Sequence, residues 1–156
     1  MFELILSDAT ELKYLKEPCK LDQILKRSLG LFEWQFTNKN INLSTSIDMH
    51  GSDQALAVYV DPKRIKQVFD NILKNSLKYT TENGKLHIFI ETSNNFIWVN
   101  FQDSSPGVDE KEFSKLFDRF YRVEKSRNRT TGGAGLGLSI CKTIMQDHEG
   151  KILARP

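Results

Sequence analysis

The sequence predicts an α/β protein, a two-layer sandwich in which helices pack on one mixed sheet. Some segments have apolar residues at helical spacing, and in shorter segments apolar and polar residues alternate as they do in strands. Helical and strand segments follow one another in only partly regular alternation along the chain. The composition, with 39% hydrophobic and 27% charged residues, is ordinary for a globular protein. A chain of 156 residues is long enough to bury a hydrophobic core, so we expect one domain.

Three segments are predicted to be long helices. Apolar residues recur at helical spacing over 21–40 and again over about 136–148. Between them, Asp61 followed by Pro62 is a typical helix start, because the carboxylate accepts the first backbone N–H groups and proline suits the first helical position. The helix that begins there should run to about Thr80.

Other residues mark helix ends and the boundary of the domain. Asp109 is expected to cap a short helix through Phe117, and Gly150 is expected to end the last long helix. Residues 1–18 are expected to be the tail of an upstream helix or a linker, since proline at the end of this stretch stops a helix. The domain itself would then comprise residues 19–156.

Several short segments are predicted strands. The last two complete ones should form an antiparallel hairpin, because only a short polar turn separates them. One more strand should begin at "KILA", residues 151–154. The complete predicted strands are "INLSTSI" (41–47), "ALAVYV" (55–60), "KLHIFIET" (85–92) and "FIWVNFQD" (96–103).

Charge, cysteines and hydropathy exclude several functions. A formal net charge of +2 is too small to indicate nucleic acid or an anionic membrane as partner. Cys19 and Cys141 have neither metal-ligand spacing nor the pattern of a disulfide framework, so a reducing cytosol is expected. We find no apolar run of membrane-spanning length and no secretory leader, and expect the chain to be soluble.

The stretch "GGAGLGLSI", residues 132–140, places four glycines within six residues before an apolar run. Glycines that lead into a helix leave N–H groups and a positive dipole end facing the loop, which suits phosphate. No Lys follows Gly137, so this is not a P-loop, and the preceding "EKSRNRTT" is too polar for the strand of a Rossmann turn. The stretch is therefore either a phosphate cradle or a flexible linker.

A line of polar residues follows the helix that starts at Asp61. Asn71, Asn75 and Lys78 stand four and three residues apart, beside the apolar stripe. Asparagine is a mediocre helix former, because its amide competes for the backbone. The line is either a solvated face or a binding row, in which an Asn oxygen ligates Mg²⁺ and the lysine meets phosphate.

Asp103 closes an apolar strand and opens the turn that continues as "SSPGV", residues 104–108. Its carboxylate has two alternative roles. It serves only the turn, which is common, or it accepts a hydrogen bond from an amino group of a flat ligand that lies against Gly107. A site of the second kind discriminates strongly against ligands without the donor.

Four motifs follow one another along the chain: "FDNILKNSLKYT", Asp-Ser-Ser-Pro-Gly-Val at 103–108, "KLFDRFYRVEKSRN" and "GGAGLGLSI". In this order they resemble the N box, the first glycine box, the F box and the second glycine box of the catalytic ATP-binding domain of sensor histidine kinases. The resemblance covers about Leu21 to Ala154, and the wording of the motifs is particularly similar to the BaeS-type envelope-stress kinases. It implies the Bergerat fold shared with gyrase-type topoisomerases and MutL-type repair proteins.

The resemblance implies that ATP and Mg²⁺ are the cofactors. Asn75 would hold the metal, with Asn71 one turn earlier beside the phosphates. Asp103 would bond the adenine amino group, and Gly107 would let the ring approach. The implied ATP-binding residues are Asn71, Asn75, Lys78, Tyr79, Asp103, Gly107, Val108, Phe120, Arg122, Gly133, Gly135, Leu136, Gly137 and Leu138.

Two further groups of these residues have implied roles. Lys78 and Tyr79 would contact phosphate and ribose or base. Phe120 and Arg122 belong to the F box under an ATP lid. The segment 122–133 is polar and basic with few apolar anchors, so we expect it to be mobile until nucleotide binds.

The sequence departs from the family pattern at several points. Ser105 stands where the pattern Asp-x-Gly-x-Gly has its first glycine. The chain stops at Pro156, before the strands that usually complete the sheet, and it lacks the helical hairpin that carries the phosphoacceptor histidine. His50, His87 and His148 do not replace that histidine, and we expect the last of them to make a contact at a helix C-terminus. No catalytic residue is therefore assigned, and the general base is expected outside the chain.

The implied partners are the dimerisation and phosphoacceptor hairpin of a parent kinase and the receiver domain of a response regulator. The parent would be anchored at the inner membrane, with this domain in the cytoplasm. One rival is a Bergerat-fold ATPase, which carries a water-activating glutamate on the N-box helix, where this chain has Gln67, Asp70 and Asn71. The other is a non-catalytic interaction module of the anti-sigma type.

Overall fold

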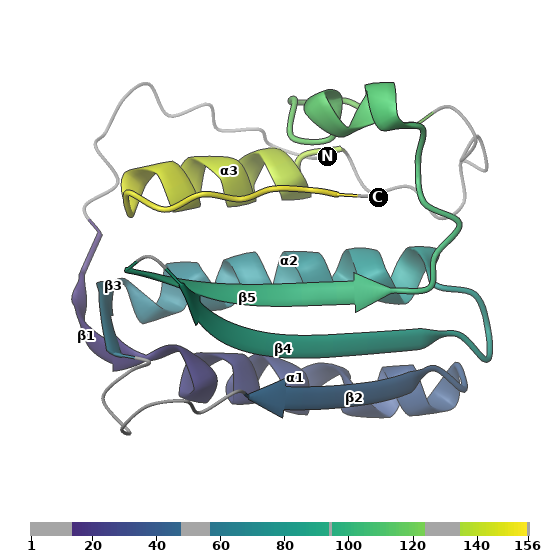
Figure 1. The fold of residues 1–156 in the computed structure, drawn as a ribbon, viewed down its shortest axis with the longest axis horizontal. Helices are drawn as coiled ribbons and strands as arrows, with labels where there is room; N and C mark the ends of the chain where they lie inside the picture. Colours follow the sequence, from purple (N-terminus) through teal and green to yellow (C-terminus); the bar gives the residue numbers. More distant parts are fainter. Residues whose placement is uncertain (1–13, 48–56, 94, 124–134, 156) are drawn as a thin grey trace, which may run out of the picture.

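A computed structural model describes residues 14–47, 57–93, 95–123 and 135–155. It is the predicted α/β sandwich, and Figure 1 shows the order of its elements. The strands are β1 (Glu17–Lys20), β2 (Asn42–Ile47), β3 (Ala57–Val60), β4 (Lys85–Ser93) and β5 (Phe96–Asp103). The helices are α1 (Leu21–Asn38), α2 (Pro62–Tyr79), the short 3₁₀ helix η1 (Glu110–Lys115) and α3 (Gly137–Asp147).

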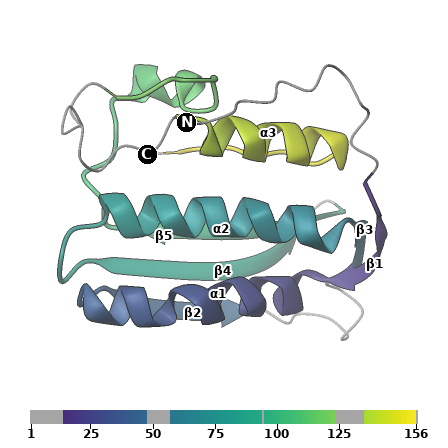
Figure 2. The ribbon, with the colours of Figure 1, turned by 180° about the vertical axis from the view of Figure 1, so that it is seen from behind.

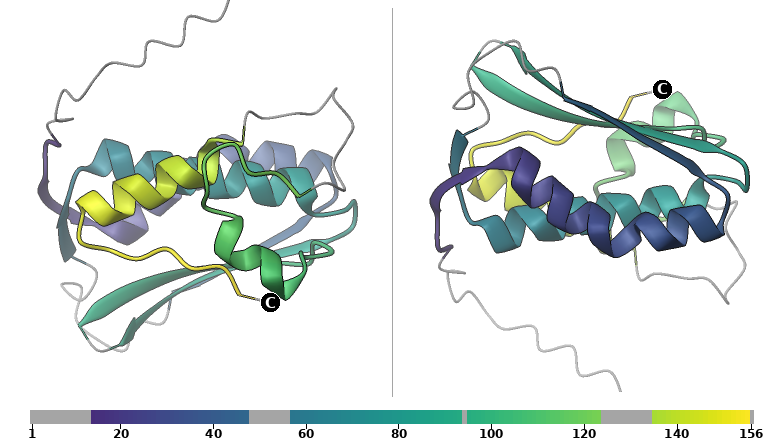
Figure 3. Two further views of the ribbon diagram at one scale, coloured as in Figure 1. Left: turned by 90° about the horizontal axis from the view of Figure 1, so that it is seen from above. Right: turned by 90° about the horizontal axis from the view of Figure 1, so that it is seen from below.

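The main sheet has the order β2-β4-β5 and is mixed, as predicted. Strand β2 runs parallel to β4, and the β4–β5 hairpin is antiparallel. Seen from behind, α1 and α2 lie in front of this sheet (Figure 2). The views from above and below show the long helices on one side and the strands of this sheet on the other (Figure 3). The fold class expected from the sequence is confirmed.

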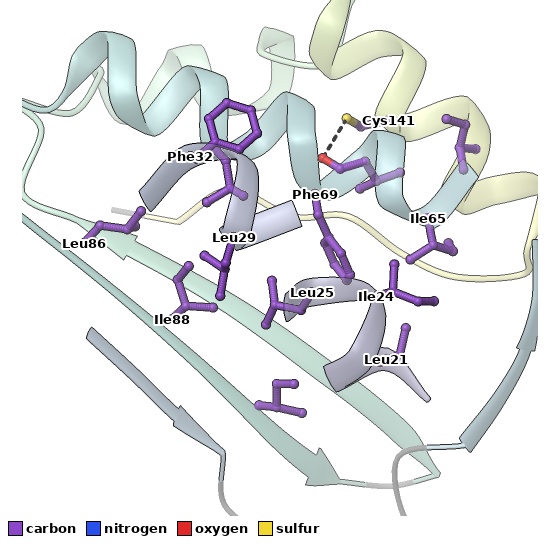
Figure 4. Close-up of a cluster of buried hydrophobic side chains, with 14 of the residues drawn as sticks. Leu21, Ile24, Leu25, Leu29, Phe32, Ile65, Phe69, Leu86, Ile88 and Cys141 are labelled. Carbon is purple, nitrogen blue, oxygen red and sulfur yellow. Dashed lines mark hydrogen bonds between the residues drawn. The ribbon is translucent and has the colours of Figure 1, made fainter. Parts of the chain in front are cut away.

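The core lies between the helices and the inner face of the sheet (Figure 4). Alternate residues of β4 point inward, and Leu86, Ile88 and Ile90 are at most 1% exposed. The apolar stripes of α1 and α2 meet them. Phe69 of α2 lies against Phe101 of β5, with ring centroids 6.0 Å apart, and so joins the helix to the strand. Burial on this scale is the main stabilising term of a small domain.

Strand β1 was not expected. It pairs antiparallel with β3 in a separate two-stranded sheet, in which Pro18 lies opposite Tyr59. The strand is preceded by three residues without regular structure, Tyr14, Leu15 and Lys16. These residues are therefore not the end of an upstream helix, which was one of the two expectations for residues 1–18. Residues 1–13 lie outside the described part of the chain.

The C-terminal end of α3 differs from the prediction in its details. Glu149, not Gly150, adopts the left-handed conformation, with φ of 57°. The Gly150 N–H bonds back to the Met145 carbonyl at 2.8 Å, which closes the helix end. A Cβ at Gly150 would come within 2.7 Å of Met145 Cε, the end of a flexible side chain that would have to move aside. Residues 151–155 do not form the strand predicted from "KILA".

Of the two predicted helix N-caps, the structure contains the one at Asp61 but not the one at Asp109. Asp61 is 7% exposed, and its Oδ1 accepts hydrogen bonds from the N–H groups of Lys63 and Arg64 at 3.0 and 3.2 Å. Asp109 makes no side-chain cap bond, and η1 is a 3₁₀ helix that ends at Lys115, so the predicted cap there was wrong. The acidic side chain at that position is exposed instead.

Asp61 also tethers the segment before β1, because its Oδ2 accepts from the Leu15 N–H at 3.0 Å. Burial raises the pKa of this carboxyl, but the three backbone N–H bonds and the nearby Arg64 outweigh it, so that the pKa is lowered overall. A lowered folded-state pKa means that the stabilisation is present above the unfolded pKa of about 3.9 and is lost as pH falls through the folded value.

We therefore expect Asp61→Ala to lower the free energy of unfolding by about 0.5–2 kcal/mol at pH 7, the usual cost of losing an N-cap. The difference from the native chain should shrink below about pH 4, as the native carboxyl is protonated. Urea unfolding at several pH values measures both. Asp109→Ala is the matched control, because its carboxylate caps nothing. A deficit that stayed constant down to about pH 2 would contradict this role of the charge.

The described residues contain no helix long and apolar enough to cross a bilayer. Cys19 and Cys141 are both free thiols. Cys141 is buried, and the loss of hydration raises its pKa to about 11, so it behaves as a small core residue.

Candidate functional site

The polar line on α2 follows the half-buried edge of that helix. Asn71 and Asn75 lie one turn apart, and both side chains are half-buried. Lys78 is also half-buried, and its Nζ is 5.0 Å from the ring centroid of Tyr79, which is 47% exposed. The line therefore begins beside the core and ends at a cation over an accessible aromatic ring.

The N-box helix and the second glycine box meet at one contact. The Asn71 side-chain amide donates to the Gly137 carbonyl at 3.3 Å, where α3 begins. A Cβ at Gly137 would lie 3.8 Å from Asn71 Cγ, so the two helices approach closely here. One turn further along α3, the Cys141 thiol lies 3.8 Å from the Val68 carbonyl (Figure 4). The structure thus brings together two motifs that are 66 residues apart.

Asp103 is the last inward-facing position of β5. It lies opposite Leu86, which is wholly buried, so its carboxylate points toward the helices and not toward the outer face of the sheet. The Ser76 hydroxyl of α2 donates to Oδ2 at 3.0 Å. Since Ser76 follows Asn75 directly, the predicted base-binding carboxylate stands beside the polar line of α2.

The turn after Asp103 is held by the same carboxylate. Oδ1 accepts from the Ser105 N–H at 3.1 Å and from the Ser105 hydroxyl. Gly107 has φ of 69°, a left-handed conformation that favours glycine, and no described heavy atom lies within 4 Å of a Cβ built there. The space over Gly107 is thus open, and the half-buried Val108 follows it.

The two described ends of the lid segment are joined. The Phe120 N–H donates to the Gly135 carbonyl at 3.1 Å, two residues before the start of α3. Both residues have positive φ, 63° and 70°, and a Cβ at Gly135 would come within 3.1 Å of the Phe120 backbone. The backbone is therefore fixed at the base of the lid. Phe120 itself is 66% exposed, and Arg122 is exposed.

Not all predicted site residues can be placed. Gly133 and the part of the lid at 124–134 lie outside the described residues, as does His50. Leu136 precedes α3, Leu138 lies in its first turn, and both are half-buried.

The two described histidines are both engaged in structural hydrogen bonds. His87 lies between Ser44 and Ser46, at 2.9 and 3.1 Å from its two ring nitrogens. His148 Nδ1 is 2.7 Å from the Ile144 carbonyl, and its Nε2 accepts from the Asp61 N–H at 3.0 Å. The expected contact of His148 at a helix C-terminus is confirmed, and the ring also joins the end of α3 to the start of α2.

Sequence reasoning missed the two serines on Asp103. Ser76 is only 4% exposed, although the line of polar residues drew attention to its neighbours. A serine on the buried side of a helix was the available signal, because a buried hydroxyl needs a partner. At Ser105 the departure from glycine was noticed, but its bond to the carboxylate was not.

The donor set fits Mg²⁺ held mainly by phosphate and water. The described residues contain no cluster of three or more His, Cys, Asp or Glu side chains that could hold a metal alone. Asn75 is half-buried, and its amide makes no hydrogen bond within the described part of the chain. Mg²⁺ takes hard oxygen ligands and keeps several waters, so a single amide oxygen is a suitable protein contribution.

The structure is an α/β sandwich in which paired helices cover a mixed sheet and a glycine box contacts a polar helix. The chain belongs to the family of histidine kinase-, DNA gyrase B- and HSP90-like ATPases, whose profile matches residues 60–156. This family is one of ATP-binding domains.

Proteins similar to this chain carry the names of sensor kinases. The histidine-protein kinase BaeS of Escherichia coli (strain K12) is 39% identical over 154 residues, which are 99% of this chain and 32% of BaeS. The sensor histidine kinase WalK of Bacillus subtilis (strain 168) is 42% identical over 104 residues, 65% of this chain and 17% of WalK. The chain thus spans a third or less of these relatives.

Solved structures agree with the fold. The nucleotide-free catalytic domain of the histidine kinase ThkA superposes with a TM-score of 0.76 at 33% identity, covering 90% of this chain and 88% of that one. ThkA in complex with the response regulator TrrA matches at a TM-score of 0.70 and 30% identity, covering 86% of this chain and 36% of that one. The resemblance to histidine kinase catalytic domains is confirmed.

Proposed function

We propose that this chain is the ATP-binding catalytic domain of a two-component sensor histidine kinase, with residues 19–156 as the domain and 1–18 as the connection to the rest of the parent. The contact between Asn71 and the Gly137 carbonyl is the main support, because it joins the N-box helix to the glycine box in a chain of this family. A glycine-rich segment that served only as a flexible linker would not need to contact that helix.

Each predicted residue has a role in this proposal. The carboxylate of Asp103 accepts from the adenine amino group over the open space at Gly107. Asn75 would hold Mg²⁺, which would neutralise part of the charge on the phosphates. Lys78 and Tyr79 contact phosphate and ribose or base. The remaining ATP contacts are Asn71, Val108, Phe120, Arg122, Gly133, Gly135, Leu136, Gly137 and Leu138.

The protein contributes positioning and electrostatic stabilisation to the transfer, with N–H groups at the start of α3 facing the phosphates. The acceptor imidazole and the general base come from a separate dimerisation hairpin. His87 and His148 are unsuitable acceptors because hydrogen bonds already occupy their ring nitrogens. The receiver domain of a response regulator then takes the phosphoryl group. The domain works in the cytoplasm, and the parent is anchored at the inner membrane, without nucleic acid as partner.

The polar residues on the first half of α2 argue against the ATPase alternative. Gln67 accepts from Arg64 Nη1 at 3.1 Å, and Asp70 is paired with Lys66 at 2.7 Å. Neither is a free glutamate that could activate water. Nothing in the described residues favours the anti-sigma type of module over a kinase domain.

The isolated chain should bind ATP in the presence of Mg²⁺ but should not phosphorylate itself. Calorimetry with a non-hydrolysable ATP analogue measures binding, and γ-labelled ATP reports transfer. Adding the acceptor hairpin of the same parent should give label on the hairpin. Stable label on this chain alone would refute the assignment of the acceptor, and failure to bind any adenine nucleotide would refute the proposed function.

A further inference from the structure

Both oxygens of the Asp103 carboxylate already have donors within the protein. The Ser76 hydroxyl donates to Oδ2 at 3.0 Å, across 27 positions of sequence from α2 to β5. At the other oxygen, the Ser105 N–H donates at 3.1 Å, and the Ser105 hydroxyl donates as well. Three donors from two serines therefore converge on one carboxylate.

The turn itself needs only one of these donors. An Asx turn is made by a carboxylate oxygen and the N–H group two residues later, which here is the bond from the Ser105 N–H. Neither hydroxyl is required for that turn. Ser76 is 4% exposed and Asp103 is half-buried, so water competes poorly for the bond between them.

A count of acceptor sites gives the consequence. An ionised carboxylate has about four lone-pair sites, two on each oxygen. The two donors from Ser105 occupy both sites of Oδ1, and Ser76 occupies one site of Oδ2. One acceptor site remains, on Oδ2, the oxygen that faces α2 and its polar line.

We infer that Ser76 and Ser105 are positioning residues that hold Asp103 with one acceptor site left for a single ligand N–H. They thereby sharpen selection for a purine with a 6-amino group over one without it. The inference rests on the proposed function, because it takes the base to bind at Asp103. The family pattern has glycine where this chain has Ser105.

The test compares two nucleotides that differ at one group. ATP and purine riboside triphosphate, which lacks the 6-amino group, are titrated by calorimetry with Mg²⁺ into the chain and into Ser76→Ala and Ser105→Ala. Each variant should lose about three- to tenfold in ATP affinity, the scale of one hydrogen bond that positions a charged group. Affinity for the analogue should stay within about twofold. Ser105→Thr keeps a hydroxyl and should restore the preference.

A double-mutant cycle separates positioning from a general structural role. In an Asp103→Ala background, either serine substitution should no longer change the ratio of the two affinities, because the side chain through which it acts is gone. Urea unfolding of each variant gives the effect on the fold independently. If Ser76→Ala does not fold, Ser105→Ala, Ser105→Thr and the cycle built on them decide the question.

The outcomes distinguish this inference from the function on which it rests. Equal losses for ATP and the analogue, or an unchanged ratio in Ser105→Ala, would overturn the positioning role while leaving the ATP site in place. An unchanged ratio in Asp103→Ala itself would place the base elsewhere and overturn both. A lower ratio in the serine variants, with no further change on adding a serine substitution to Asp103→Ala, supports the inference.

Discussion

Asn75→Ala should weaken ATP binding by about ten- to a hundredfold when Mg²⁺ is present, and should change it little in chelator. The loss corresponds to one interaction with a charged group, roughly 1.5–3 kcal/mol. The substitution removes an amide that has no hydrogen-bond partner in the described residues, so the fold should lose little. Calorimetric titrations of ATP with metal and with chelator give the two affinities.

Asp103→Asn is the matched control, because its proposed partner is the base and not the metal. It should weaken ATP about equally with and without Mg²⁺, and by less than Asn75→Ala does with metal, since an amide oxygen still accepts one bond. Guanine has a carbonyl where adenine has its amino group, so GTP should bind the native chain poorly. The asparagine can donate to that carbonyl and should narrow the gap.

The four affinities of each variant, for ATP and GTP with metal and with chelator, form one decisive set. Loss of ATP affinity in Asn75→Ala that is as large in chelator as in Mg²⁺ would mean that the residue does not act through the metal. An ATP-to-GTP preference that Asp103→Asn left untouched would mean that the adenine site lies elsewhere.

Local patterns were sufficient for most of the helices and strands. The start of α2 followed from Asp61 and Pro62, and the hairpin β4–β5 from alternation on either side of a short turn. Strand β1 could not be found in this way, because proline, glutamate and lysine are depleted in strands. Its partner β3 stabilises it through pairing that only the folded chain supplies.

Contacts between distant residues account for what sequence reasoning missed at the site. The sequence indicated Asn71 and the glycine box separately, but only the packing of α3 on α2 brings Asn71 to the Gly137 carbonyl. The bond from Ser76 to Asp103 likewise depends on how α2 crosses β5. The end of α3 depends on contacts of this kind too, because the Gly150 N–H bonds back to the Met145 carbonyl while Glu149 adopts the left-handed conformation.

Phe69→Ala should lower the free energy of unfolding by about 3–5 kcal/mol, a large share of the stability of a domain of this size. Phe69 is 5% exposed and lies between α2 and β5, so its removal leaves a cavity in the core (Figure 4). It also removes the ring contact with Phe101, which is worth about 0.5–1.5 kcal/mol beyond its area. Phe69→Leu fills much of the cavity and should cost less. Urea unfolding compares both with the native chain.

The same variant tests whether packing and binding are separable. Phe69 supports the helix that carries Asn71 and Asn75 and the strand that ends in Asp103, but it is not itself a proposed ligand contact. Nucleotide affinity measured well below the unfolding transition should therefore stay within about tenfold of the native value, and ligand at a hundred times its dissociation constant should restore about 2.7 kcal/mol. Lys74→Ala, on the exposed face of the same helix, should change stability by less than about 0.5 kcal/mol. A Phe69→Ala chain as stable as Lys74→Ala would show that α2 is not held to β5 through this ring.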